Sequence, residues 1–128
     1  LAEASTSTVR TGLPGGGGTP LASGIEAALA LADATRRQGD TPVLVFLTDG
    51  RANVTRDGRP DRAVAESQSL AAARCVRAAG LGAIVVDTAP RAQPLAEQVA
   101  VEMGARYLPL PHARSKVLDN AIRAATRD

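Results

Sequence analysis

Two uninterrupted apolar runs stand out along the chain, Val-Leu-Val-Phe-Leu at positions 43–47 and Ala-Ile-Val-Val at 83–86. Short continuous apolar runs are typical of strands that are covered on both faces, as in a parallel sheet. A third, shorter strand is predicted at 105–108. The first run is followed by Thr48 and Asp49, and the second ends in Asp87. These aspartates should therefore lie at the carboxyl ends of strands.

Between these runs, apolar residues recur every three or four positions, which predicts amphipathic helices. The first helix should begin at Thr19-Pro20, with the threonine as cap and the proline in the first turn, and end before Gly39. The second is predicted at about 62–79, the third around 95–103, and the last after a cap at Ser115. The inward positions of the first, third and last helices are Leu21, Ile25, Ala28, Leu29 and Ala32; Leu95, Val99 and Met103; and Val117, Leu118, Ala121, Ile122 and Ala125.

Alternating helices and buried strands predict an α/β fold, a parallel-sheet, Rossmann-like arrangement with helices on both faces. Residues 1–12 are rich in Ser, Thr and Ala and show no convincing period, so they are interpreted as a flexible or remnant segment. The rest, residues 13–128, should form one domain. In such folds ligands bind beyond the carboxyl ends of the strands.

Composition narrows the class of protein. Apolar residues make up 45% of the chain but aromatic residues only 2%, so the core must be built from Ala, Val, Leu and Ile. The single cysteine, Cys75, excludes an internal disulfide and is interpreted as a small core residue. No signal peptide or membrane span is recognisable, and a cytoplasmic location is expected. A net charge of +2 without interleaved aromatic residues does not indicate nucleic-acid binding.

The glycines at 15–18 precede a helix start, where free N–H groups could hold an anion. However, Thr19-Pro20 stands where a phosphate-binding loop needs Lys followed by Ser or Thr. The plain interpretation is a turn into a capped helix. Thr19 and Asp49 should both lie at the carboxyl edge of the sheet, where a hydroxyl and a carboxylate suit Mg²⁺. The alternative for Asp49 is an Asp-Gly turn.

Several stretches together resemble the von Willebrand A (integrin I-type) family and, within it, the D-subunit family of magnesium chelatases. They are the glycine run with Thr19-Pro20-Leu21, the strand at 43–47 with Thr48–Asn53, and residues 85–88 and 105–111. The resemblance implies a metal-ion-dependent adhesion site in which Thr19 and Asp49 are ligands. The family's other ligands come from a DxSxS motif on the first strand. Residues 3–7 imitate that motif only superficially, so a partial domain lacking the first strand is expected.

The resemblance also implies a function. The chain would be a non-catalytic, Mg²⁺-assisted docking module of a complex that inserts Mg²⁺ into protoporphyrin IX for bacteriochlorophyll or chlorophyll synthesis. The partners would be the I subunit, an AAA+ ATPase, and the porphyrin-binding H subunit, with an oligomeric ring in the full-length protein. The alternative is a small α/β hydrolase-type enzyme that uses the glycine-rich loop as an anion site and Asp49 as a base.

Other polar residues admit two interpretations each. A polar loop near Asp49 carries four arginines, Arg51, Arg56, Arg59 and Arg62. They form either a docking rim for an acidic partner, with Arg51, Arg56 and Arg59 as its binding residues, or a solvated loop. Asp87 either begins a turn or supports a site at the strand edge. His112 has no acidic or cysteine neighbour in the sequence and is interpreted as a surface-loop residue.

Overall fold

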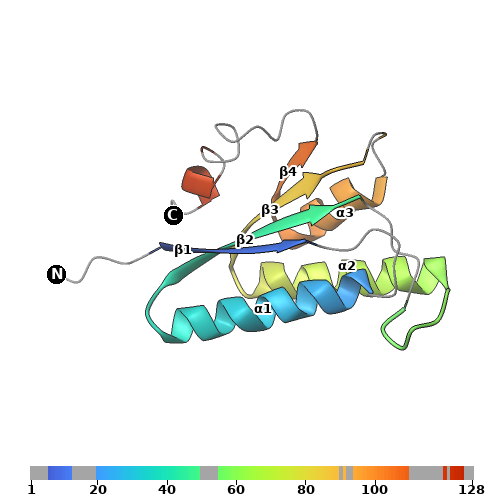
Figure 1. The fold of residues 1–128 in the computed structure, drawn as a ribbon, viewed down its shortest axis with the longest axis horizontal. Coiled ribbons are helices and arrows are strands. Elements are labelled where there is room, and N and C mark those ends of the chain that lie inside the picture. The colour runs from blue at the N-terminus through green and yellow to red at the C-terminus, as the bar shows by residue number, and fades with distance from the viewer. Residues whose placement is uncertain are drawn as a thin grey trace.

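The sheet consists of four parallel strands in the order in which they occur in the sequence, β1-β2-β3-β4 (Figure 1). A computed structural model describes residues 6–12, 20–49, 55–89, 91, 94–109, 120 and 122–125, with the main chain alone for 6–12. The strands are β1 (Thr6–Gly12), β2 (Thr41–Thr48), β3 (Gly82–Asp87) and β4 (Arg106–Pro109). The helices that connect them are α1 (Leu21–Arg37), α2 (Arg62–Ala78) and α3 (Pro94–Met103).

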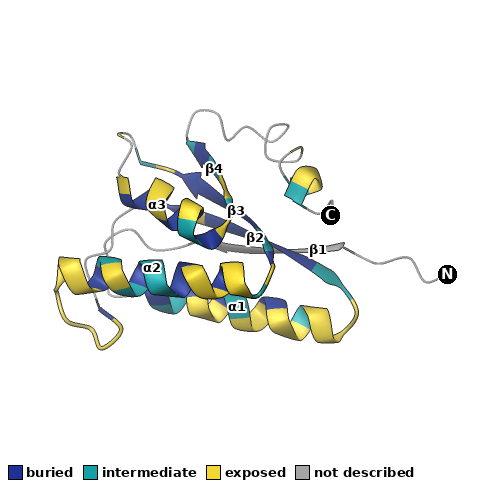
Figure 2. Ribbon diagram, turned by 180° about the vertical axis from the view of Figure 1, so that it is seen from behind, coloured by how far each residue is buried: buried dark blue, intermediate teal, exposed yellow. Residues whose placement is uncertain are grey.

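All three helices cover one face of the sheet (Figures 1 and 2). Alternate residues of β2 and β3 point toward them, so that Leu44, Phe46 and Val85 share one apolar cluster with Ile25 and Val76 of the helices. Phe46 is the largest fully buried side chain and lies on a central strand. The remaining contributions to this core are mainly alanine, as the composition requires: Ala22, Ala28, Ala32, Ala65, Ala72, Ala73, Ala83 and Ala100.

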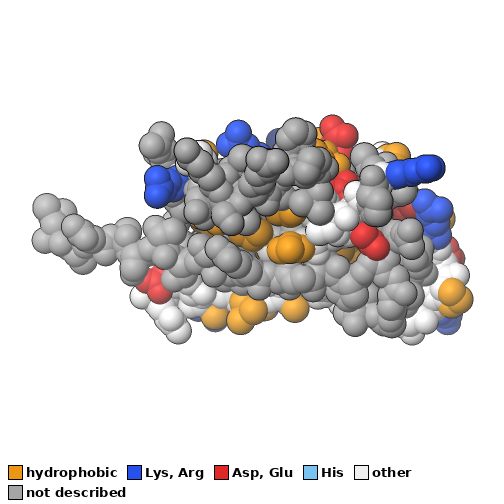
Figure 3. Space-filling model, turned by 45° about the horizontal axis from the view of Figure 1, so that its top comes forward, with side chains coloured by type: hydrophobic (Ala, Val, Ile, Leu, Met, Phe, Trp, Pro, Cys, Tyr) orange, Lys and Arg blue, Asp and Glu red, His pale blue; other side chains and the backbone are white. Residues whose placement is uncertain are grey.

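The second face carries the other alternate residues. Val45, Ile84, Val86 and Leu108 form a separate buried cluster, against which Ile122 of the C-terminal helical segment packs. Figure 3 looks toward this face and shows hydrophobic side chains near its middle. The predicted α/β class with helices on both faces is therefore confirmed, with three helices on one face and described turns of the last helix on the other.

Two glycines permit a sharp turn and a close backbone approach at the start of β3. Gly80 has φ +69°, a left-handed conformation that ends α2 at little steric cost. A Cβ on Gly82 would come within 2.6 Å of the carbonyl oxygen of Ala125. Because glycine has no such atom, the C-terminal segment can approach the start of β3 closely.

Residues 1–12 were predicted to be a flexible or remnant segment, and the part that the structure describes is a regular strand and not a flexible one. Residues 6–12 form β1, and the main chain pairs with β2 from Thr6↔Thr41 to Gly12↔Leu47. The strand is stabilised by ladder hydrogen bonds, and its sequence lacks the apolar pattern that identifies a buried strand. Consequently β2 has a neighbour on both sides.

The start of α1 also differs from the prediction. Pro20 occupies the N-cap position with ψ 136°, makes no side-chain cap hydrogen bond, and accepts from the amide of Gly24 at 3.2 Å. The extended ψ of Pro20 excludes it from the first helical turn, where it was expected. Thr19, the predicted cap, lies outside the described residues, as do Ser115 and the first part of the last helix.

Candidate functional site at the carboxyl edge

The carboxyl ends of the strands meet at one edge of the sheet, which we call the carboxyl edge. In the strand register Thr48 of β2 pairs with Asp87 of β3, and Asp87 pairs with Pro109 of β4. The first turns of α1 and α2 lie at the same end of the molecule (Figure 1). This arrangement follows from parallel strands connected by helices, and it gathers loops from distant parts of the sequence.

Asp49 lies directly beyond β2 at this edge and is half-buried. The main chain before it is fixed because the amide of Thr88 donates to the carbonyl of Thr48 at 2.9 Å. The structure therefore places Asp49 where the sequence predicted it. Thr19, Arg51 and His112 lie outside the described residues, and the pairing of Thr19 with Asp49 stays a prediction.

Asp87 is almost fully buried, with 1% of its surface exposed, and both carboxylate oxygens accept hydrogen bonds. The amide of Ala89 donates to Oδ1 at 2.9 Å, and the hydroxyl of Tyr107 donates to Oδ2 at 2.5 Å. The first bond joins residues two positions apart and closes a turn, so the interpretation of Asp87 as the start of a turn is confirmed. The second ties the end of β3 to β4.

The pKa of Tyr107 is raised to about 12, first by burial, then by the hydrogen bond to Asp87 and by the charges of Asp87 and Glu97. Removing a proton from the partly buried Tyr107 would place a negative charge in contact with the buried Asp87 carboxylate, which opposes ionisation. The hydroxyl therefore remains a donor throughout the physiological range. Sequence analysis missed this partner, because nothing in the sequence shows that β4 lies beside β3.

The loop before α2 is held by its own polar groups. The Thr55 side chain is buried, hydrogen-bonds Asp57, and accepts from the amide of Arg59 at 3.1 Å. The Thr55 amide donates to the Arg59 carbonyl at 2.9 Å. The carboxylate of Asp61 accepts from the amide of Val64 at 3.2 Å and so caps α2.

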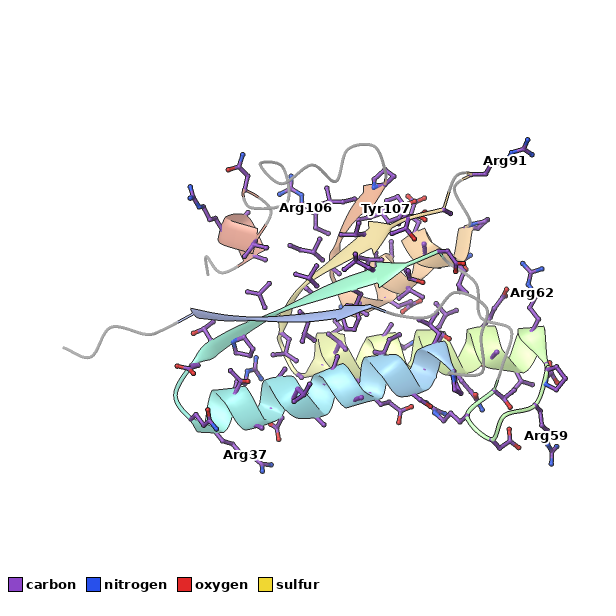
Figure 4. All side chains as sticks on the ribbon, in the orientation of Figure 1. Arg37, Arg59, Arg62, Arg91, Arg106 and Tyr107 are labelled. Carbon is purple, nitrogen blue, oxygen red and sulfur yellow. The ribbon has the colours of Figure 1, made fainter. Side chains whose placement is uncertain are left out.

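Two of the predicted rim arginines have partners within the chain. Arg56 binds Glu26 of α1 through Nε at 2.5 Å, and its amide donates to Gln68 of α2 at 2.8 Å. Arg59 binds Asp57 at 3.1 Å, with 80% of its side chain exposed. Arg56 therefore joins the loop to both helices, whereas Arg59 projects into solvent (Figure 4). The docking role predicted for both stays a prediction.

A third arginine at this edge escaped the sequence analysis. Arg91 follows β3, is exposed, and points away from the molecule (Figure 4). Within the described part of the chain it makes no hydrogen bond or ion pair. Arg62, at the start of α2, binds Glu66 one helical turn later at 3.0 Å.

The chain shares extensive sequence identity with known proteins. It is 47% identical over 117 residues to the magnesium-chelatase 60 kDa subunit of Cereibacter sphaeroides, covering 91% of the chain and 21% of that subunit. The corresponding 60 kDa subunit of Rhodobacter capsulatus is 45% identical over 114 residues, covering 89% and 20%. The magnesium-chelatase 67 kDa subunit of Chlorobaculum parvum is 34% identical over 119 residues, covering 85% and 19%. The chain is homologous to a segment of magnesium-chelatase subunits.

The chain spans about a fifth of the length of these chelatase subunits. No family profile and no solved structure matches it. Homology to the chelatase subunits therefore rests on sequence identity, and the parallel architecture rests on the strand register described above. Among the described residues, no helix is long and apolar enough to cross a membrane.

Apart from the carboxyl edge, this chelatase-subunit homologue has a groove of about 550 Å³ between α1 and α2. Leu29, Ala72 and Leu81 contribute apolar lining, and Cys75 lies among them. Cys75 is exposed, so its interpretation as a core residue was wrong. The buried stripe of α2 passes through Ala65, Ser69, Ala72, Ala73 and Val76, and Cys75 falls beside that stripe, toward the groove.

Proposed function

We propose that the chain is a metal-assisted protein-docking module of the von Willebrand A type within a magnesium-chelatase subunit. The observation that carries this proposal is 45–47% identity to the 60 kDa subunits over about nine-tenths of the chain. The position of Asp49 at the carboxyl edge of a parallel sheet supports it, because ligands bind at that edge in related folds.

In this proposal the complete complex inserts Mg²⁺ into protoporphyrin IX. An I subunit of the AAA+ class hydrolyses ATP, an H subunit holds the porphyrin, and this chain binds a partner without catalysing a step. The magnesium ion that is inserted is the substrate of the complex. The ion at the docking edge would be a second one, held by this chain.

Asp49 and Thr19 are the residues that would hold this second ion. A half-buried carboxylate oxygen suits Mg²⁺, which needs only one or two protein carboxylates and retains several waters. The described residues contain no group of three or more His, Cys, Asp or Glu side chains placed to bind a metal. When bound, Mg²⁺ would supply a positive centre that a carboxylate of the partner can ligate.

The decisive experiment compares Asp49→Ala with Asp33→Ala in the full-length protein. Binding to purified I and H subunits is measured by calorimetry with Mg²⁺ and with a chelator. Asp33 is an exposed carboxylate on α1 that pairs with Arg37, so its removal makes the same change in charge away from the edge. We expect Asp49→Ala in Mg²⁺ to bind at least about tenfold more weakly than the parent protein, a loss typical of a removed interface contact. Asp33→Ala should bind normally.

Identical affinities for Asp49→Ala and the parent protein, with no effect of the chelator, contradict metal-assisted docking. Turnover of a phosphate ester by the full-length protein, abolished by Asp49→Ala, would instead favour the small α/β enzyme.

The arginine rim is tested separately. We expect the double change Arg56→Ala with Arg59→Ala to weaken partner binding, since arginine forms paired hydrogen bonds with carboxylates. Arg56 also anchors its loop through Glu26, so Glu26→Ala is the matched control. If Glu26→Ala weakens binding as much as the double change, the loss comes from loop anchoring and the rim has no direct role.

A further inference from the structure

The arginines at the carboxyl edge differ in what they already bind. Arg56 pairs with Glu26, Arg59 with Asp57 and Arg62 with Glu66. Arg91 is exposed and has no such partner among the residues that the structure describes. A partner that displaces an existing ion pair must replace it, whereas Arg91 can accept a carboxylate without that loss.

The main chain that precedes Arg91 is held in place by hydrogen bonds. Thr88 donates to the carbonyl of Thr48 at 2.9 Å, which links the chain after β3 to the residue preceding Asp49. Asp87 accepts from Ala89 at 2.9 Å and from Tyr107 at 2.5 Å. The segment that leads to Arg91 therefore begins from three hydrogen bonds beside Asp49. Pre-organisation of this kind lowers the entropy lost when a side chain is immobilised in a complex.

We propose that Arg91 is a partner-contacting residue of the carboxyl edge, that it binds a carboxylate on an acidic protein surface, and that the Tyr107–Asp87 hydrogen bond positions it. This proposal rests on the docking function proposed above and adds the charge of the partner surface. Figure 4 shows Arg91 at the same end of the molecule as Arg59 and Arg62, while Arg37 lies at the opposite end.

The charges around Arg91 favour a protein partner over a nucleic acid. A phosphate backbone is bound by several unneutralised cations at once. Among the described arginines of this edge, Arg59 is paired with Asp57 and Arg62 with Glu66, whereas the guanidinium of Arg91 keeps its donors available. A single guanidinium matches a single carboxylate through two parallel hydrogen bonds.

The test uses the full-length protein with Arg91→Glu, and Arg37→Glu as its matched control. Arg37 has 79% of its side chain exposed and lies at the other end of α1. Affinity for the purified I and H subunits is measured at two salt concentrations. We expect Arg91→Glu to weaken binding to one of them by at least about tenfold, with a reduced salt dependence, and Arg37→Glu to change it by less than about twofold. Equal losses of affinity in Arg91→Glu and Arg37→Glu overturn the proposal. So does binding to mixed-sequence DNA that is lost in Arg91→Glu.

The positioning role of Tyr107 is tested by a double-mutant cycle. Tyr107→Phe removes the hydrogen bond to Asp87 while retaining the ring. Because Tyr107 acts through Arg91, we expect Tyr107→Phe to weaken binding about threefold in the parent protein and to have no further effect in Arg91→Ala. The same loss in both backgrounds would show a general structural effect and overturn the positioning role.

These outcomes are separable from those of the docking proposal. Binding that requires Mg²⁺ and Asp49 but tolerates Arg91→Glu overturns the role of Arg91 alone. Binding that depends on Arg91 but is unaffected by a chelator retains the acidic partner surface and contradicts the metal.

Discussion

The two ends of the parallel sheet use arginine in different ways. At the amino end, Arg36 of α1 donates to the carbonyls of Ala79 and Gly80 at 2.5 and 3.0 Å, which satisfies free carbonyl groups at the end of α2. At the carboxyl end, Arg91 is exposed and binds no described residue. The acceptors within reach therefore decide whether an arginine stabilises the fold or remains available to a partner.

The difference extends beyond these two residues. At the amino end, a positive side chain next to the carboxyl terminus of a helix is also favoured by the helix dipole. At the carboxyl end, a buried carboxylate, Asp87, accepts hydrogen bonds from Tyr107 and Ala89. Asp87 therefore ties β3 to β4 at the carboxyl edge, Arg56 anchors the loop before α2, and Arg59 and Arg91 project outward.

The largest expected effect on stability is that of Asp87→Ala. If this change left the free energy of unfolding unaltered, the stabilising role given to Asp87 at the carboxyl end would be contradicted. The change leaves the Tyr107 hydroxyl and the Ala89 amide without their acceptor. We expect the free energy of unfolding to fall by about 3 kcal/mol, as for loss of a buried charged acceptor. Asp87→Asn retains an oxygen that can accept from Tyr107, and should lose less. Urea unfolding measures both, and equal losses would show that the hydrogen bond to Tyr107 is not what matters.

The next effect is a fall in the free energy of unfolding at high pH, caused by Tyr107. As the pH rises above 10, tyrosine in the unfolded chain ionises, while Tyr107 in the folded chain keeps its proton until about pH 12. The stabilisation is therefore complete below pH 10 and is lost between pH 10 and 12, by at most about 2 kcal/mol. Tyr107 is the only tyrosine of this chain, which has no tryptophan, so the tyrosinate absorbance of the chain by itself reports the titration of Tyr107 directly. A midpoint near 10 in the folded protein would contradict the contact with Asp87, and Tyr107→Phe should lack this part of the alkaline loss.

The smallest effects compare the two arginines directly. Arg36→Ala removes two hydrogen bonds to the end of α2, and we expect it to lower the free energy of unfolding by about 1 kcal/mol. Arg91→Ala removes no contact with a described residue and should change stability by less than about 0.5 kcal/mol. Thermal unfolding of the two variants beside the parent protein tests this pair. A larger loss for Arg91→Ala than for Arg36→Ala would reverse the comparison.

The sequence predicts the fold where hydrophobic burial determines it. The strands β2 and β3 are continuous apolar runs, and α1 to α3 carry an apolar stripe, so each could be located from its period. The strand β1 was missed because ladder hydrogen bonds to β2 hold it, and such bonds leave no apolar pattern in the sequence. Cys75 was misplaced because its position beside the α2 stripe depends on how α1 packs against α2.

The candidate site could be predicted only where it depends on local sequence. The position of Asp49 at a strand end follows from local sequence, and the structure places it at the expected edge. The bonds Arg56–Glu26 and Tyr107–Asp87 join residues 30 and 20 positions apart, so they depend on tertiary packing. Arg91 was overlooked because its availability is apparent only once the partners of the neighbouring arginines are known.

The central claim is that partners bind at the carboxyl edge. Hydrogen exchange of backbone amides in the full-length protein, with and without the I and H subunits in Mg²⁺, tests it most directly. We expect a bound partner to slow exchange in residues 55–61 and in residues 88, 89 and 91, which lie at the carboxyl edge. Residues 36–41 and 79–82 at the amino end should be unchanged. Slowed exchange confined to the amino end, or equal at both ends, would contradict the claim.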